Sequence, residues 1–248
     1  MPDSRRHRGP HPEDHRLFGD ERVEDLRGAV EDFSLLLTRG YAVPSALKLV
    51  GDHFNLTERQ RTAVQRASCS DEAREIRRRS EISLTEIENQ PLAIDGYNLL
   101  TTLETALSGG AIFICRDGCL RDMASIHGTY RKVEETLPAL RLLGEFIADA
   151  NAGAVRILLD SPVSNSGRLK AAIENANERW KVELVNNPDP ILAAGDEVVV
   201  SADSIILDSA RRWVNLARHI IPSRIADAWI VDLSKPPTAS ERRRGVRR

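Results

Sequence analysis

The sequence predicts an α/β fold preceded by a small all-α module. Two observations lead to this prediction. Between residues 91 and 235, short apolar runs alternate with longer runs of helical periodicity, whereas residues 21–69 show helical periodicity alone. Alternation of this kind is typical of βαβ units, so we expect a mostly parallel sheet sandwiched by helices. A chain of 248 residues with 41% hydrophobic and 29% charged residues has the composition of a soluble protein with one or two domains.

The segments outside these two parts differ in composition. Residues 1–20 and 236–248 are rich in arginine and lack apolar periodicity, so we expect two disordered basic tails. Such tails are usually solvated, but beside a nucleic-acid-binding core they would add phosphate contacts. Residues 70–90 are strongly charged and are expected to form a helical or extended linker.

The helical module is expected to contain three short helices. Apolar residues recur at three- and four-residue steps from Val23 to Leu37. Gly40 is suited to follow the end of this first helix, and Pro44 to open the second. Thr57 is expected to cap a third helix that runs to about residue 67.

The α/β part is expected to contain ten elements between residues 91 and 232. In order they are strand 91–95, helix 97–108, strand 111–115, helix 133–150, strand 154–160, helix 166–179, strands 181–185 and 197–201, helix 203–220 and strand 228–232.

Acidic residues follow several of these strands, and the carboxyl ends of parallel strands share one edge of a sheet. The acids are Asp95, Asp117, Asp122, Asp160 and Asp203, with Asp208 further along the last helix. Carboxylates in one crevice raise one another's pKa unless a cation neutralises them. Oxygen ligands suit Mg²⁺ or Mn²⁺, and such a site can hydrolyse a phosphodiester. The alternative is that these acids are turn formers or helix N-caps.

Two further features are candidates for substrate binding. The segment that follows Asp160 leads into a helix and offers a candidate anion site made of Ser164, Ser166, Gly167 and Arg168. Equally, a serine there would only cap the helix. The segment matches no Walker pattern, so it does not predict nucleoside triphosphate binding. Tyr97, beside the first acid, either stacks on a base or packs under the first helix.

Residues 91–235 resemble the PIN-like nucleases, and in particular their NYN branch. The resemblance rests on the Asp95-Gly96-Tyr97-Asn98 segment after the first strand and on Ser201-Ala202-Asp203-Ser204 after a later strand. It implies that Asp95 and Asp203 bind metal and that Asn98 is a partner of Asp95.

Within the same resemblance, Asp160 would be a central metal ligand and Asp208 a supporting acid. The family's usual Asp-Ser-Asp-Phe is here Asp203-Ser204-Ile205-Ile206, which lacks the second acid. If Asp208 does not replace that acid, the resemblance implies a protein that binds RNA without cutting it.

The helical module resembles a small domain of unknown function found beside PIN-like domains in uncharacterised prokaryotic proteins. The residues that carry this resemblance are 35–41, 45–47 and 59–66. It implies no activity.

Three functions follow as hypotheses. The first is a Mg²⁺- or Mn²⁺-dependent ribonuclease with catalytic residues Asp95, Asn98, Asp160, Asp203 and Asp208. The second is a non-catalytic RNA-binding scaffold, and the third is a phosphatase or nucleotide hydrolase. The expected partners are RNA and, as an option, a second copy in a homodimer.

The sequence also predicts a cytoplasmic protein without a membrane partner. No apolar run reaches the roughly 18 residues of a membrane span, and the N-terminus is polar rather than signal-like. Its three cysteines predict neither a disulfide framework nor a zinc site.

Overall fold

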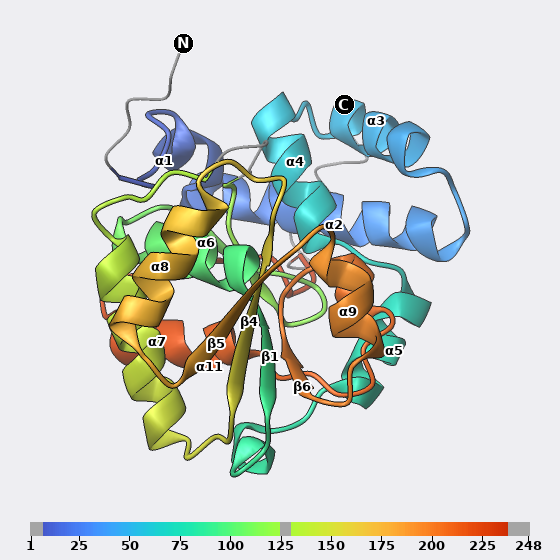
Figure 1. The fold of residues 1–248 in the computed structure, drawn as a ribbon. Coiled ribbons are helices and arrows are strands. Elements are labelled where there is room, and N and C mark those ends of the chain that lie inside the picture. The colour runs from blue at the N-terminus through green and yellow to red at the C-terminus, as the bar shows by residue number, and fades with distance from the viewer. Residues whose placement is uncertain (1–6, 125–129, 238–248) are drawn as a thin grey trace.

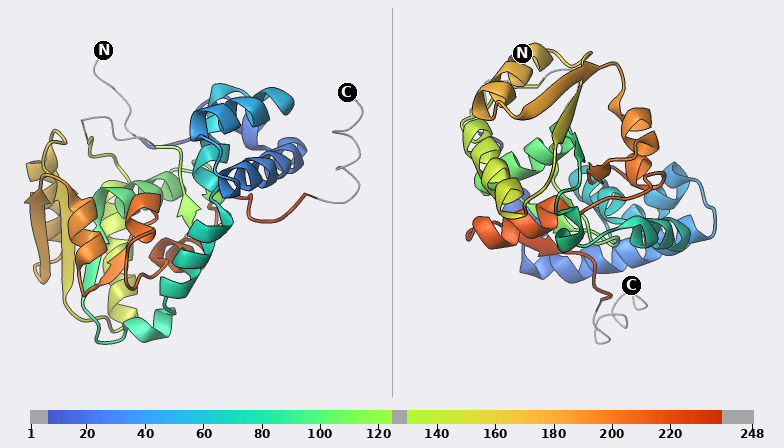
Figure 2. Two further views of the ribbon diagram at one scale, coloured as in Figure 1. Left: turned by 90° about the vertical axis from the view of Figure 1, so that its right-hand side faces the viewer. Right: turned by 60° about the horizontal axis from the view of Figure 1, so that its bottom comes forward.

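The computed structural model describes residues 7–124 and 130–237 and has the α/β fold that the sequence predicts (Figure 1). A helical N-terminal region precedes a parallel four-stranded sheet flanked by helices, and a small three-stranded sheet lies beside it. The helical module lies beside the α/β domain, and the chain passes from one to the other through α5, Asp71–Ser80 (Figure 2).

The helical module forms at the signals that the sequence contains. Gly40 follows the end of the longest helix with a φ of 78°, a conformation that favours glycine. Thr57 and Gln60 form a reciprocal capping box at the start of α4, as expected for the third predicted helix. The helices are α1 (Asp14–Phe18), α2 (Asp20–Thr38), α3 (Val43–His53) and α4 (Glu58–Ala67), followed by α5.

The expectation of a disordered tail over residues 1–20 is wrong for residues 7–20. This segment contains α1, in which Leu17 and Phe18 are buried. The Phe18 ring meets the edge of Phe113 with 5.0 Å between ring centroids. Two apolar side chains are enough to order this segment because they pack into an apolar cluster formed by other parts of the chain. Residues 1–6 and 238–248 of the expected tails lie outside the described residues.

The main sheet has the strand order β5-β4-β1-β6, and all its pairings are parallel. Its central strand pairs on both sides, with Leu92 opposite both Val155 and Val198. The carboxyl ends of all four strands therefore lie along one edge. The strands are β1 (Leu92–Asp95), β4 (Val155–Asp160), β5 (Trp180–Val185) and β6 (Val198–Val200).

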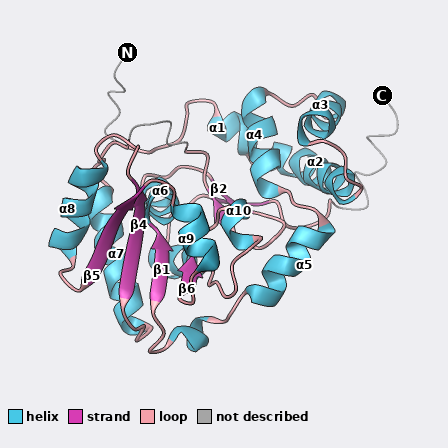
Figure 3. Cartoon of the chain, turned by 45° about the vertical axis from the view of Figure 1, so that its right-hand side comes forward, coloured by secondary structure: helices cyan, strands magenta, loops and turns pink. Residues whose placement is uncertain are grey.

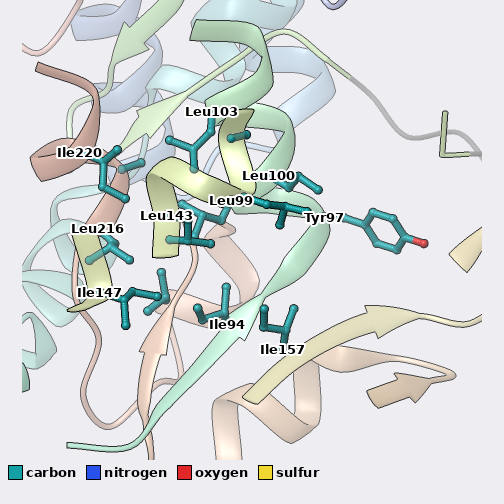
Figure 4. Packing of buried hydrophobic residues seen from close by; sticks show 14 of the residues in the cluster. Ile94, Tyr97, Leu99, Leu100, Leu103, Leu143, Ile147, Ile157, Leu216 and Ile220 are labelled. Atoms are coloured by element: carbon teal, nitrogen blue, oxygen red, sulfur yellow. The ribbon is translucent and has the colours of Figure 1, made fainter. Parts of the chain in front are cut away.

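Residues along each strand alternate between two apolar layers, one on each face of the sheet. Leu92 and Ile94 pack into the larger layer with four helices, as Figure 4 shows for part of the cluster. Ala93 and Leu158 pack into the smaller layer with two short helices. The first layer contains α6 (Gly96–Leu107), α7 (Thr136–Asp149), α8 (Ser166–Ala176) and α11 (Leu216–Arg224), and the second contains α9 (Pro188–Ala194) and α10 (Ser204–Leu207) (Figure 1 and Figure 3). Among the described helices, none combines the length and the apolar character that crossing a membrane requires.

The strands expected at 111–115 and 228–232 do not join the main sheet. They form β2 (Ile112–Ile114) and β7 (Ile230–Asp232) of the small sheet, together with an antiparallel β3 (Leu120–Arg121). The reason is packing, because Phe113 and Val231 share an apolar cluster with the helical module. The small sheet thus attaches the module to the α/β domain.

The expectation of a single helix over residues 203–220 is wrong. The chain instead forms α10, leaves helical conformation and resumes as α11. Between them Trp213 is fully buried, its backbone bridges Val199 of β6, and its indole Nε1 donates to the Arg77 carbonyl. Burial of this side chain against the sheet overrides the helical periodicity.

Candidate active site

The site begins where β1 passes into α6. Asp95 ends the strand and caps the helix, its Oδ1 accepting a hydrogen bond of 3.3 Å from the backbone N of Asn98. Glycine is needed at position 96 because the chain passes so close to β4 that a side chain would not fit. A Cβ at this position would lie 2.6 Å from Leu159 Cδ2 and 2.8 Å from Ile157 Cγ2. The Asp95 carboxyl is therefore fixed by strand, cap and close packing together.

The two segments that carry the PIN-like resemblance are in direct contact. Ser201 Oγ donates to Asp95 Oδ2 at 2.9 Å, and the backbone N of Ala202 donates to Asn98 Oδ1 at 2.8 Å. Asp203 N donates to Ser201 Oγ at 3.0 Å, and Asp203 caps α10 by accepting from the backbone N of Ile205. The carboxyl ends of β1 and β6 are thus joined through side chains.

A pocket of about 620 Å³ opens at this edge of the sheet. Asp95, Asn98, Asp160 and Asp203, all predicted from the sequence, line it together, and Tyr97 lines it as well. The other lining residues that matter chemically are Arg66, Arg121, Asp122 and Asp189.

The charges of the acids in this pocket act on one another. Burial, together with the charges of Asp203 and Asp189, raises the pKa of Asp95 to about 7 against the opposing hydrogen bonds from Ser201 and Asn98. Burial also raises the pKa of Asp189, followed by the charges of Asp203 and Asp160. Within the described part of the chain, no ion pair compensates any of these four carboxylates. Acids in this state favour a bound cation.

Two buried oxygen atoms in the pocket have no hydrogen-bond partner among the described residues: Oδ1 of Asp160 and the hydroxyl of Tyr97. Burial, and then the charge of Asp160, raise the pKa of the Tyr97 phenol to about 12. The Tyr97 ring points away from the labelled leucines and isoleucines of the core (Figure 4). The centroid of this ring is 5.4 Å from that of the Tyr130 ring. A ligand or a cation would provide the missing partner for such a buried oxygen atom.

The donor set fits a hard divalent cation in its chemistry. It consists of carboxylate oxygens with an uncompensated negative charge. Among residues 7–124 and 130–237, no three histidine, cysteine or acidic side chains are close enough to hold a metal ion between them. Mg²⁺ commonly keeps several waters and takes one or two carboxylates plus substrate phosphates, so two acids with water are a sufficient protein contribution.

Asp208 does not line the pocket. Its Oδ1 accepts from Arg77 Nε at 2.7 Å, and Arg77 also donates to Asp117. Asp117 is bound by Arg121 in turn, through two hydrogen bonds of 2.9 and 2.7 Å. Because the expected helix breaks after α10, Asp208 is turned toward this ion-pair network.

The segment after Asp160 forms a structured turn, and of its residues only Val163 lines the pocket. Ser164, Ser166, Gly167 and Arg168 are not among the residues that line it. Neither serine caps α8. The N-cap position is held by Asn165, which has a left-handed conformation with a φ of 69°. Ser166 is buried, and its hydroxyl donates to the carbonyl of Ser161.

Reasoning from the sequence did not include Asp189, Arg66 and Arg121 in the site. Asp189 follows the expected strand 181–185. The rule that acids after parallel strands meet at one edge of the sheet therefore identifies Asp189 once this strand is included. Asp122 was recognised as an acid after a strand, although its strand belongs to the other sheet. Arg66 and Arg121 depend on how the module docks, for which the sequence has no local signal.

Comparison with known proteins gives families without stated activities. Residues 84–219, over half of the chain, match the family model described as "Domain of unknown function (DUF5616)". Residues 25–80 match the model described as "Protein of unknown function (DUF434)". A protein of Methanocaldococcus jannaschii described as "Uncharacterized protein MJ0935" is 34% identical over 188 residues, which cover 74% of this chain and 89% of that protein. No solved structure gives a significant match.

Proposed function

We propose that this chain, which belongs to the family described as "Domain of unknown function (DUF5616)", is a metal-dependent nuclease that acts on RNA. One observation carries the proposal. Asp95, Asp160 and Asp203 come from three strand ends far apart in the sequence, and they line one pocket in which none of the three forms an ion pair with a described residue. The PIN-like resemblance of the segments around Asp95 and Asp203 supports the same function.

Asp95 and Asp203, which Ser201 links, are the two acids that would hold Mg²⁺ or Mn²⁺, with water and substrate oxygens as the other ligands. Such an ion lowers the pKa of its bound water and stabilises charge during phosphodiester hydrolysis. Asp208 has no part in the proposed site, since it pairs with Arg77 instead.

The other residues of the chain orient these acids. Ser201 holds Asp95 Oδ2 and receives the backbone N–H of Asp203, so one hydroxyl sets the relation between the two carboxylates. Asn98 fixes the backbone before Asp203 through its bond to Ala202. The network makes the acidic cluster rigid before any ligand arrives, which limits the reorganisation needed at the moment of reaction.

A second candidate is a non-catalytic RNA-binding protein. The observation that favours it is that both carboxyl oxygens of Asp95 already accept hydrogen bonds from the protein. In this case Asp95 serves as a helix cap and a tie between strands, and the protein binds RNA without cutting it.

The experiment that tests the proposal is cleavage of end-labelled single-stranded and structured RNA by the purified protein. The reactions contain Mn²⁺, Mg²⁺ or EDTA. Cutting that requires a divalent cation supports the nuclease. Salt-sensitive binding without cutting under any condition contradicts the nuclease and favours the scaffold. Neither cutting nor binding contradicts both, and a phosphatase substrate is then the next to assay.

A further inference from the structure

Arg66 comes from α4 of the helical module, yet it lines the same pocket as the carboxylates of the α/β domain. Its side chain is 29% exposed, so it is held in place without being buried. The pocket therefore combines acids from strand ends with a guanidinium from a separate, N-terminal unit.

Backbone carbonyl groups position this guanidinium. Nη1 of Arg66 donates to the carbonyl oxygen of Asp122 at 2.6 Å and to that of Ala124 at 2.9 Å. The Asp122 carboxylate is 4.0 Å from Nη1 and accepts closer hydrogen bonds from Thr102 Oγ1 and from the backbone N of Ala124. These contacts orient the guanidinium at the edge of the pocket.

Arg121, the other arginine of the pocket, is engaged differently. It is buried, it donates twice to the Asp117 carboxylate, and its Nε donates to the carbonyl of Ala202. Its charge is thus matched by a carboxylate, and its role is to hold the backbone beside Asp203. The Arg66 side chain is 29% exposed against 10% for Arg121, so Arg66 is better placed to meet a ligand.

A nucleic-acid strand needs such a cation here. The five carboxylates that line the pocket repel phosphates, and the metal ion of the proposed function would compensate only at the bond that is cut. Guanidinium groups bind phosphate oxygens through paired, charge-assisted hydrogen bonds. We infer that Arg66 binds a backbone phosphate of the RNA beside the acidic pocket, so that the helical module supplies part of the RNA-binding surface. This inference rests on the proposed function in taking RNA as the ligand.

The test measures binding rather than cutting. A fluorescently labelled single-stranded RNA is titrated in EDTA with the full chain carrying Asp95→Asn, a background in which metal-dependent cleavage does not interfere. Fluorescence anisotropy gives the Kd at several salt concentrations for this parent and for added Arg66→Gln, Arg66→Lys or Arg74→Gln. Arg74 is the matched control, because it is exposed on the neighbouring helix α5 and does not line the pocket.

Arg66→Gln is expected to reduce the slope of log K against log salt by about 0.7, the contribution of one phosphate contact to a single strand. The same relation predicts binding about fivefold weaker at a salt concentration of about 0.1 M. Arg66→Lys keeps the charge and should keep the slope, and Arg74→Gln should bind like the parent. Circular dichroism melting of each variant shows whether it is folded.

Three outcomes would overturn the inference. They are an unchanged slope in Arg66→Gln, an equal loss in Arg66→Lys accompanied by a lower melting temperature, and no RNA binding by the parent at low salt. The cleavage assay is independent of these measurements. Binding that depends on Arg66, together with no cutting by the wild type, would refute the nuclease and leave this inference standing.

Discussion

Ser201 Oγ donates a hydrogen bond of 2.9 Å to Asp95 Oδ2, although the two residues are 106 positions apart in the chain. The same oxygen accepts from the backbone N of Asp203. A single hydroxyl therefore sets how the acid of β1 stands relative to the acid that follows β6. The predictions for the site follow from this arrangement.

Ser201→Ala is predicted to shift the pH dependence of cleavage. The hydrogen bond from Ser201 lowers the pKa of Asp95 against the effect of burial, so its loss raises that pKa further. Hydrogen bonds to charged groups contribute about 1.5–3 kcal/mol, so the shift should be on the order of one pH unit. The acid limb of kcat/KM should move to higher pH, with little change well above it.

The measurement is a pH–rate profile of the wild type and of Ser201→Ala. Ser223→Ala serves as the control, because its hydroxyl bonds only to helix carbonyls of α11. An acid limb that stays in place in Ser201→Ala would contradict the role of this hydrogen bond.

Asp95→Asn is predicted to change how stability depends on pH. The pKa of Asp95 is about 7 in the folded protein, against 3.8 in the unfolded chain. Between these values the folded state binds more protons, so the free energy of unfolding of the wild type falls as pH rises from about 4 to about 7. The full pKa difference corresponds to a loss on the order of 4 kcal/mol.

The amide introduced by Asp95→Asn does not titrate, so the stability of the variant relative to the wild type should increase over this pH range. Urea denaturation in EDTA at pH 5 and pH 7.5 tests this, with Asp196→Asn as the control because the Asp196 side chain is 90% exposed. Parallel pH profiles for Asp95→Asn and the wild type would show that Asp95 is ionised in the fold.

Asp117→Ala is predicted to destabilise the protein by about 3–5 kcal/mol, because it leaves the buried Arg77 and Arg121 without their shared carboxylate. Burial alone would raise the pKa of Asp117, but the two guanidinium groups hold it well below its usual range. Its stabilising effect is therefore complete above the unfolded pKa and is lost as pH falls below it toward the folded value.

Urea denaturation at pH 7 and pH 3 measures this contribution. Asp71→Ala removes a carboxylate of the surface pair with Arg116, and it should cost less than about 1 kcal/mol. A similarly small loss for Asp117→Ala would mean that the buried network does not stabilise the fold.

Asp208→Asn is predicted to leave cleavage within about twofold of the wild type, since Asp208 faces Arg77 and not the pocket. Its side chain is 41% exposed, so the lost ion pair should lower stability by only about 0.5–1 kcal/mol. Cleavage rates and urea midpoints of the same preparation test both statements. Loss of cleavage with unchanged stability would return Asp208 to the active site.

The sequence was sufficient to predict the acids that depend on local rules. Asp95 ends a buried strand, Asp203 follows one, and both cap the helices that come next; in a parallel sheet such residues meet at one edge. The prediction that Asp208 supports the site assumed a continuous helix after Asp203. Burial of Trp213 against β6 breaks that helix, and periodicity does not register a tertiary contact.

Other features depend on how distant segments dock. Phe113 and Val231 are as apolar as residues of the main sheet, and only their packing against the helical module assigns them to a second sheet. Arg66 reaches the pocket for the same reason. Its neighbours in the sequence indicate a polar helix face and nothing about the acids it accompanies.

The most direct test of the nuclease is the rate at which Asp95→Asn cleaves end-labelled RNA in Mn²⁺, beside the wild type and Asp196→Asn. The proposed site predicts that Asp95→Asn stays folded and loses at least about a hundredfold in rate, the equivalent of a few kcal/mol of transition-state stabilisation. Asp196→Asn should cut like the wild type, and EDTA should stop both. Cleavage by folded Asp95→Asn at the wild-type rate would contradict the assignment of the active site to this edge of the sheet.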